Sequence, residues 1–280
     1  MKQRIITALI LAPLVVWGIF SLPLTWFLLA LAGITLVGAW EWTQFTLNQS
    51  RITALIPITV VTVASLVFIP TDVVTLNQIN ATHLSILGIG TGWWLFASAL
   101  TLTYPKSSAI WQHSNFLRHL FGVLTLLPFL WSILILRGHE YPIDSFYGAK
   151  LVLFVCLIVW AADSGAYFAG KSLGKHKMAP KVSPNKTIEG LIGGIVTALI
   201  VAWGSSELLD IRFSSFASMM VITLATVVIS VLGDLVESMF KRVSAIKDSS
   251  NIIPGHGGIL DRVDSLTAAF PIFALLYFTL

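Results

Sequence analysis

Charged residues are scarce in this sequence. Only 11% of its 280 residues are Asp, Glu, Lys or Arg, whereas soluble domains carry about 25%. Hydrophobic residues make up 56% of the chain. This balance excludes an ordinary soluble globular protein. It predicts an all-α, polytopic integral membrane protein, because helices satisfy their own backbone hydrogen bonds inside the bilayer.

Cysteine, a cleavage site and internal repeats are also lacking. The single cysteine, Cys156, lies in an apolar run, so no disulfide can form within the chain and we expect this residue to contribute packing only. No small-x-small cleavage site follows the first apolar run, which predicts an uncleaved span. No internal repeat is visible, which argues against a transporter built from inverted repeats.

Long apolar runs fill most of the chain. Each is roughly 16 to 21 residues long, close to the ~20 that a helix needs to cross a bilayer. The last run is short and contains Pro271. We predict about nine transmembrane helices, at residues 5–20, 24–40, 53–70, 84–103, 119–136, 150–169, 188–204, 216–236 and 266–280.

The positive charges indicate an orientation for these spans. If the N-terminus is cytoplasmic and nine spans alternate, the outer loop 71–83 contains no Lys or Arg. Of the 17 Lys and Arg residues, the outer segments then hold only Arg137, Lys150 and Arg212. The positive-inside rule therefore favours a cytoplasmic N-terminus and a C-terminus on the outer side. It also places the charged loops 171–187 and 237–265 in the cytoplasm.

One stretch near the C-terminus is unlike its apolar surroundings. Residues 238–264 read SMFKRVSAIKDSSNIIPGHGGILDRVD and combine carboxylates, cations and a glycine-rich turn. Carboxylates bind Mg²⁺-type ions, Lys and Arg bind phosphate oxygens, and glycine lets a ligand approach the backbone. The stretch therefore predicts a site for a polyphosphate held with a divalent metal. A loop that is merely solvated would explain its cations, but not its clustered carboxylates.

The spacing of the acidic residues supports such a site. If the preceding helix continues into the stretch, Asp234, Glu237 and Lys241 share one helix face. If a new helix begins near Leu260, the residues at 261 and 264 are i, i+3 neighbours, and their carboxylates can share a metal ion or its waters.

Two segments upstream carry further polar residues. Asp163 ends an apolar run, where a carboxylate is costly and usually faces a polar cavity or a partner. The alternative is a buried Asp–Lys pair that holds two helices together.

Loop 171–187 has five lysines and no acidic residue, and Thr187 with Glu189 is typical of a helix N-terminus that binds an anion. Contact with the membrane surface alone is the alternative.

Glu41 stands between two tryptophans at a predicted cytoplasmic interface. A functional carboxylate is one interpretation. We favour the other, an interfacial carboxylate whose hydrogen bonds are satisfied beside its aromatic anchors.

The stretch 238–264 resembles the signature of the phosphatidate cytidylyltransferases, membrane enzymes that make CDP-diacylglycerol from CTP and phosphatidic acid. The matching positions run from Ser238-x-Phe240-Lys241-Arg242 to His256-Gly257-Gly258-x-x-Asp261-Arg262-x-Asp264, and more than a dozen are specified. WAADSGAY (160–167) and PKVSPNKTIEG (180–190) resemble further patterns of this family. The resemblance covers the whole chain and is closest to the bacterial form.

The resemblance implies a metal-dependent nucleotidyltransferase of phospholipid biosynthesis that releases pyrophosphate. It implies Mg²⁺ or another divalent cation, leaves a second ion open, and suggests a homodimer in the bacterial cytoplasmic (inner) membrane. CTP, phosphatidate and the lipid bilayer are the expected partners, and nucleic acid is not.

The expected site residues combine the spacing with this resemblance. The expected metal ligands are Asp234 and Asp248, with Asp261 and Asp264 as further candidates. The expected catalytic residues are Asp234, Asp248, Lys247, His256, Asp261 and Arg262. The expected substrate-binding residues are Asp163, Lys181, Ser183, Lys186, Lys241, Arg242 and Glu237.

The expected organisation has a scaffold of five spans at 1–136 and a catalytic region at 137–280. Two other functions stay open from the residues alone. One is a membrane enzyme that joins a phospho-group to a different lipid or polyprenol carrier. The other is a secondary transporter that couples ions through Asp163 and Asp234.

Overall fold

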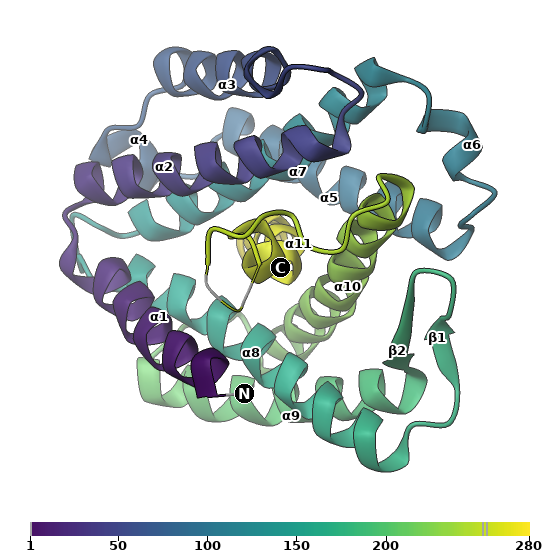
Figure 1. The fold of residues 1–280 in the computed structure, drawn as a ribbon. Coiled ribbons are helices and arrows are strands. Elements are labelled where there is room, and N and C mark those ends of the chain that lie inside the picture. Colours follow the sequence, from purple (N-terminus) through teal and green to yellow (C-terminus); the bar gives the residue numbers. More distant parts are fainter. Residues whose placement is uncertain (1, 254, 256) are drawn as a thin grey trace.

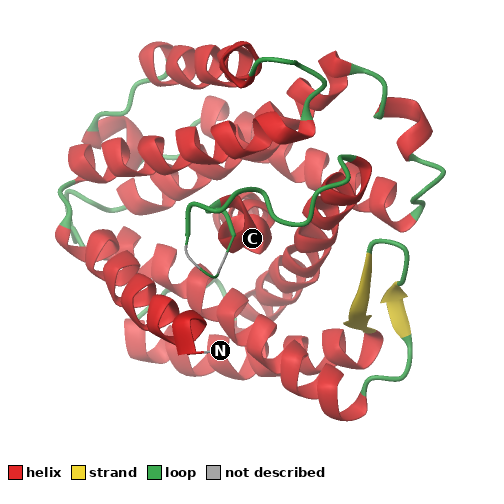
Figure 2. Ribbon diagram, in the orientation of Figure 1, coloured by secondary structure: helices red, strands yellow, loops and turns green. Residues whose placement is uncertain are grey.

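The computed structural model describes residues 2–253, 255 and 257–280, and these are mostly helical (Figure 2). The first half contains α1 (Lys2–Ser21), α2 (Leu24–Trp42), the 3₁₀ helix η1 (Thr43–Phe45), α3 (Arg51–Phe68), α4 (Val73–Asn77), α5 (Ala81–Leu102), α6 (Ser108–Trp111) and α7 (Asn115–Gly138). The second half contains α8 (Tyr147–Leu173), β1 (Lys177–Ala179), β2 (Ser183–Thr187), α9 (Ile188–Leu209), α10 (Phe216–Val243) and α11 (Leu260–Thr279).

The nine predicted spans all fall on helices. Within the described residues, seven helical segments are long and apolar enough to cross a membrane, namely α2 with η1, α3, α5, α7, α8, α9 and α10. Helix α1 contains only a shorter apolar segment, Leu9–Ser21. Helix α11 begins with three charged residues in its first turns. The polytopic helical architecture is confirmed.

Helix α11 lies at the centre of the bundle, where Figure 1 shows it almost end-on with the other long helices around it. It packs against α10, α7, α5 and α8. Every residue from Ser265 to Ala274 is buried. A helix that is buried on all sides belongs to the core and not to the lipid-facing surface. Most of the shortest predicted span, up to Ala274, is therefore surrounded by protein.

Helices α8 and α9 approach each other closely because glycines line their contact. A Cβ atom on Gly193 would collide with the Cβ of Ala169, and one on Gly165 would collide with Thr197 Oγ1. Small residues let helix backbones come together in membranes, where dispersion contacts supply much of the association energy. This packing fixes the helix that carries Asp163 against the helix that follows the lysine-rich loop.

Replacing Gly193 by alanine should force these two helices apart. We expect a loss of about 1–3 kcal/mol in stability, as for other overpacked contacts. Gly204→Ala is the matched control, because a Cβ at this other glycine of α9 meets nothing within 4 Å. Denaturation in detergent should show a lower stability for Gly193→Ala and no loss for Gly204→Ala. Equal stabilities would contradict the close packing.

The lysine-rich loop forms a β-hairpin, which the sequence did not predict. Strands β1 and β2 are antiparallel, with Lys177 opposite Thr187 and Ala179 opposite Ser183. The N-cap predicted at Thr187 is confirmed, since its hydroxyl accepts a hydrogen bond from the Gly190 amide at 3.1 Å. The hairpin therefore leads without a break into α9.

Two contacts fix the hairpin to the bundle. Glu189 accepts hydrogen bonds from the backbone amides of Lys175 and His176 and pairs with the His176 ring at 2.6 Å. At the hairpin turn, Arg242 Nε of α10 donates to the Val182 carbonyl at 3.1 Å. The loop is thus a fixed wall beside α10 and not a free surface loop.

Candidate active site

A polar cavity of about 490 Å³ opens where α8, β2, α9, α10 and α11 meet. Ligand sites commonly have volumes of about 300–1,000 Å³. Its charged lining residues come from segments that lie far apart in the sequence. They are Asp163, Lys186, Asp234, Lys241, Asp248, Asp261, Arg262 and Asp264.

Lys186 and Asp234 form one side of this cavity. Lys186 Nζ lies 2.7 Å from Asp234 Oδ2 and also donates to the Val231 carbonyl at 3.1 Å. Both side chains remain partly exposed to the cavity, at 23% and 30%. This ion pair joins the end of the hairpin to α10. The sequence had left open an Asp–Lys pair at Asp163, but the partner of Lys186 is Asp234.

Lys241 and Asp261 form a second, more buried pair. Lys241 Nζ donates to Asp261 Oδ1 at 2.8 Å and lies 3.4 Å from Glu237 Oε1. The predicted helix geometry is confirmed, since α10 continues to Val243 and α11 begins at Leu260. The shared face of α10 therefore directs Lys241 onto the first turn of α11.

The other oxygen of Asp261 organises the preceding loop. Asp261 Oδ2 accepts hydrogen bonds from the Ser249 amide, the Ser249 hydroxyl and the Gly258 amide, each at 2.8 Å. With the lysine on its first oxygen, Asp261 has four donors in all. This carboxylate therefore fixes the chain between α10 and α11 in addition to lining the cavity.

Glu41 of α2 contacts the same loop, although it lies more than 200 residues away in the sequence. Its carboxylate is fully buried and accepts hydrogen bonds from the amides of Ile259 and Leu260 at 2.9 and 2.6 Å. It also accepts from the hydroxyls of Ser249 and Ser250. The sequence-based interpretation of a satisfied carboxylate is correct, but it missed which segment supplies the donors. A lone carboxylate near the end of an apolar run was the only available signal.

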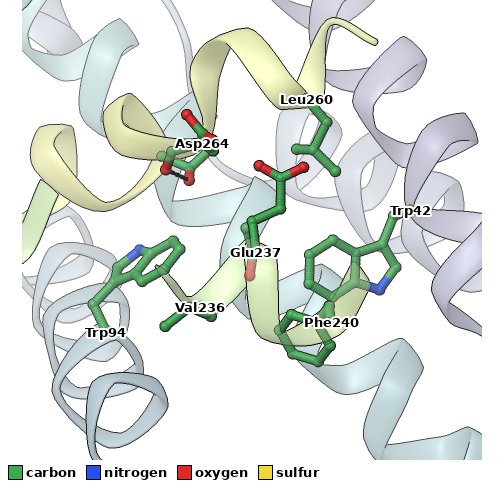
Figure 3. Close-up of a pocket in the computed structure, with 9 residues that line it drawn as sticks. Trp42, Trp94, Val236, Glu237, Phe240, Leu260 and Asp264 are labelled. Carbon is green, nitrogen blue, oxygen red and sulfur yellow. Dashed lines mark hydrogen bonds between the residues drawn. The ribbon is translucent and has the colours of Figure 1, made fainter. Parts of the chain in front are cut away.

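Glu237 lies behind Lys241 and not on the open cavity. It lines a second, water-sized pocket of about 10 Å³ together with Trp42, Trp94 and Phe240. Figure 3 shows its side chain between these aromatic rings and Asp264. The carboxylate is 5% exposed, and among the described residues it has no hydrogen-bond partner. Glu237 therefore forms an ion pair with Lys241 on the side away from the cavity. It holds the lysine in place but does not line the cavity itself.

Asp163, Asp234 and Asp264 all line the cavity. Asp264 interacts electrostatically with both of the others, and Asp163 interacts with Asp234, Lys186 and Arg262. Carboxylates of like charge that share one site repel each other unless a cation lies among them.

The remaining predicted site residues are more scattered. Asp248 is exposed and lines the cavity, and Arg262 is exposed on the first turn of α11. Lys181 is exposed on the hairpin turn, Lys247 is exposed on the loop after α10, and Ser183 begins β2. The residues that line the cavity include none of these three and do not include Arg242. His256 lies outside the described residues.

The donor set of the cavity suits a hard divalent cation. Five carboxylates line it against three cationic side chains, so it has an excess of negative charge. Oxygen ligands of this kind bind Mg²⁺. Within the described residues, no group of three or more His, Cys, Asp or Glu side chains is placed so that it could hold a metal ion by itself.

Comparison of the sequence with known proteins finds a family and several similar proteins. A family model described as "Cytidylyltransferase family" matches residues 2–280. A protein of Haemophilus influenzae named phosphatidate cytidylyltransferase is 43% identical over 289 residues, which cover 99% of this chain and 99% of that protein. A protein of the same name from Pseudomonas aeruginosa is 38% identical over 276 residues, covering 99% and 96%. One from Bacillus subtilis is 43% identical over 190 residues, covering 66% of each chain.

Proposed function

The chain belongs to the cytidylyltransferase family, and from this premise we propose that it is a phosphatidate cytidylyltransferase. It transfers the cytidylyl group of CTP to phosphatidate and releases CDP-diacylglycerol and pyrophosphate. The observation that carries the proposal is the cavity in which carboxylates from α8, α10 and α11 meet cations from β2, α10 and α11. The nearly full-length likeness to proteins of that name supports the choice of substrates.

The reaction needs little proton chemistry. An oxygen of the lipid phosphate attacks the α-phosphorus of CTP, a new P–O bond forms, and the bond to the β-phosphate breaks. A phosphate monoester is already anionic near neutral pH, so it requires no strong general base. The barrier comes from bringing two polyanions together and from the charge that develops on the leaving pyrophosphate. The site must supply positive charge and orientation.

We assign the carboxylates and cations of the cavity to these two needs. Asp163, Asp234, Asp248 and Asp264 line the cavity and would each contribute oxygen ligands to a divalent ion. Such an ion, when bound, neutralises phosphate oxygens and the developing charge on pyrophosphate. Lys186 and Arg262 line the same space and would bind phosphate oxygens. Lys247 and His256 remain proposed contacts to the nucleotide.

The cavity also has an apolar side that suits a lipid. Ala166, Tyr167 and Leu191 of α8 and α9 line it, and the tyrosine is 61% exposed. Its neighbours Phe168 and Ile192 are exposed apolar residues on the same two helices. Phosphatidate would therefore enter sideways from the membrane, while CTP enters from the aqueous side. We propose that this side is the cytoplasm and that the membrane is the bacterial inner membrane, where the enzyme forms a homodimer.

Pyrophosphate release from detergent-purified protein tests this proposal. We expect release only when CTP, phosphatidate and Mg²⁺ are all present, and we expect a chelator to abolish it, because the cavity alone has too little positive charge for two polyanions. Release with another lipid phosphate or nucleotide would keep the reaction class and change the substrate. The proposal fails if stable, monodisperse protein turns over no nucleotide, and ion transport in vesicles would then be examined.

A further inference from the structure

Glu41 is absent from every set of expected site residues, yet it lies at the base of the loop that carries them. Helix α11 begins at Leu260 and receives no capping hydrogen bond from a side chain at its own N-cap residue. The first amides of a helix need acceptors, and a carboxylate there is further favoured by the helix dipole. Glu41 of α2 supplies both the acceptor and the negative charge, because its carboxylate accepts hydrogen bonds from the amides of Ile259 and Leu260.

The same carboxylate connects directly to Asp261. The Ser249 hydroxyl donates its single proton at 2.8 Å to Asp261 Oδ2 and shares it with Glu41 Oε2 at 3.3 Å, so one serine lies between the two acidic side chains. Asp261 in turn holds Lys241, which lines the cavity. A continuous chain of contacts therefore leads from Glu41 through the serine and the aspartate to the lysine.

The packing leaves little space for this loop to shift. A Cβ on Gly258 would collide with Ser249 Oγ and would lie 2.5 Å from Glu41 Oε1. The Gln44 side chain, about one helical turn after Glu41, donates to the Ser249 carbonyl. On the other side, Arg51 of α3 donates to the Trp40 carbonyl at 2.6 Å and to Thr43 Oγ1 at 2.9 Å, which braces the end of α2.

We infer that Glu41 is a positioning residue of the active site: it caps α11 from α2 and fixes Ser249, Asp261 and Lys241 in register with the cavity. It is not among the residues that line the cavity, so it acts through the loop. A misplacement of about 1 Å at a catalytic constellation can cost on the order of 100-fold in rate. Both carboxylate oxygens of Glu41 accept from loop donors, so a side-chain amide in its place would set an N–H donor against those donors.

The test is Glu41→Gln, which has the same shape but cannot accept through both side-chain atoms. We expect kcat to fall about 10- to 100-fold, while KM for CTP changes less than about threefold, because the groups that bind phosphate remain. Amide hydrogen exchange should become faster in residues 249–262 and stay unchanged in α7. Glu207→Gln, at an exposed site near the far end of α9, is the matched control and should behave as wild type.

Ser249→Ala provides a second route to the same conclusion. It removes the bridging hydroxyl but leaves the Ser249 amide bonded to Asp261. We expect a smaller fall in kcat than for Glu41→Gln, and a double variant no worse than Glu41→Gln alone within about twofold, because both changes interrupt one chain of contacts. If Glu41→Gln does not fold, Ser249→Ala decides the inference. A lower kcat together with faster amide hydrogen exchange in the loop supports it, and wild-type kcat and exchange overturn it.

The kinetic part of this test depends on the proposed function, whereas hydrogen exchange does not. If wild-type protein does not turn over CTP and phosphatidate, the proposed reaction is refuted. The rate of amide hydrogen exchange in the loop of Glu41→Gln would still show whether Glu41 positions that loop. Unchanged kcat and exchange in Glu41→Gln would overturn the inference. So would exchange that rises equally in α7, because Glu41 would then stabilise the whole bundle and not the loop.

Discussion

Replacing Asp234 by asparagine should lower kcat/KM for CTP by about 1,000-fold, which is the scale of losing a principal electrostatic contact in an active site. Asp234 pairs with Lys186 at 2.7 Å and interacts electrostatically with Asp264, which lines the same cavity. Asparagine keeps its shape but loses the charge that a divalent cation and the lysine require. Steady-state kinetics at several Mg²⁺ concentrations measure the effect.

Asp210→Asn is the control for this change. Asp210 is exposed at the end of α9, in the left-handed conformation with φ 52°, which asparagine adopts as readily as aspartate. Its activity should equal that of wild type. Activity of Asp234→Asn within about tenfold of wild type, in well-folded protein, would remove Asp234 from the proposed metal ligands.

Replacing Lys241 by methionine should destabilise the protein by about 3–5 kcal/mol, as expected when one partner of a buried ion pair is lost. The lysine lies 2.8 Å from Asp261 and 3.4 Å from Glu237, and their side chains are only 4% and 5% exposed. Without it, two carboxylates remain buried with no cation on these oxygens. Denaturant titration in detergent, with helicity as the signal, measures the loss.

Two further variants test the cause of this loss. Adding Glu237→Gln to Lys241→Met should recover part of the stability, because it removes one of the two uncompensated charges. Lys150→Met should cost less than about 1 kcal/mol, because its pair with Asp144 is long, at 3.6 Å, and both side chains are 26–40% exposed. If Lys150→Met and Lys241→Met lost equal stability, burial would not be the cause.

The elements near the site differ in how well the sequence predicted them. The helices that carry Asp163 and Asp234 were located by their long apolar runs, which are a local signal, although α8 and α10 extend up to four and seven residues beyond the predicted spans. The β-hairpin was missed, since its strands are short and its residues are mostly polar. Its position depends on Arg242 and Glu189, which lie outside the strands and contribute contacts that no periodic pattern records.

The roles of Asp261 and Asp264 show the limit of spacing arguments. At i, i+3 the two carboxylates were expected to act together on a metal. In the structure both carboxylates line the cavity and both interact with Lys241. Asp261 also accepts hydrogen bonds from Ser249 and Gly258, whereas Asp264 also interacts electrostatically with Asp234 and Asp163. Neighbours on one helix thus meet different surroundings, because each faces a different element of the bundle.

Composition and local pattern were enough to predict the class of protein, the positions of the long helices and the concentration of charge near the C-terminus, and the resemblance of the motifs indicated the family. These features depend on apolar runs of bilayer length and on residues close together in the chain. Only the packed bundle establishes that the last helix is its buried centre, that Lys186 pairs with Asp234, and that Glu41 caps α11. Such contacts join residues tens to hundreds of positions apart, and they are specified only when all the helices come together.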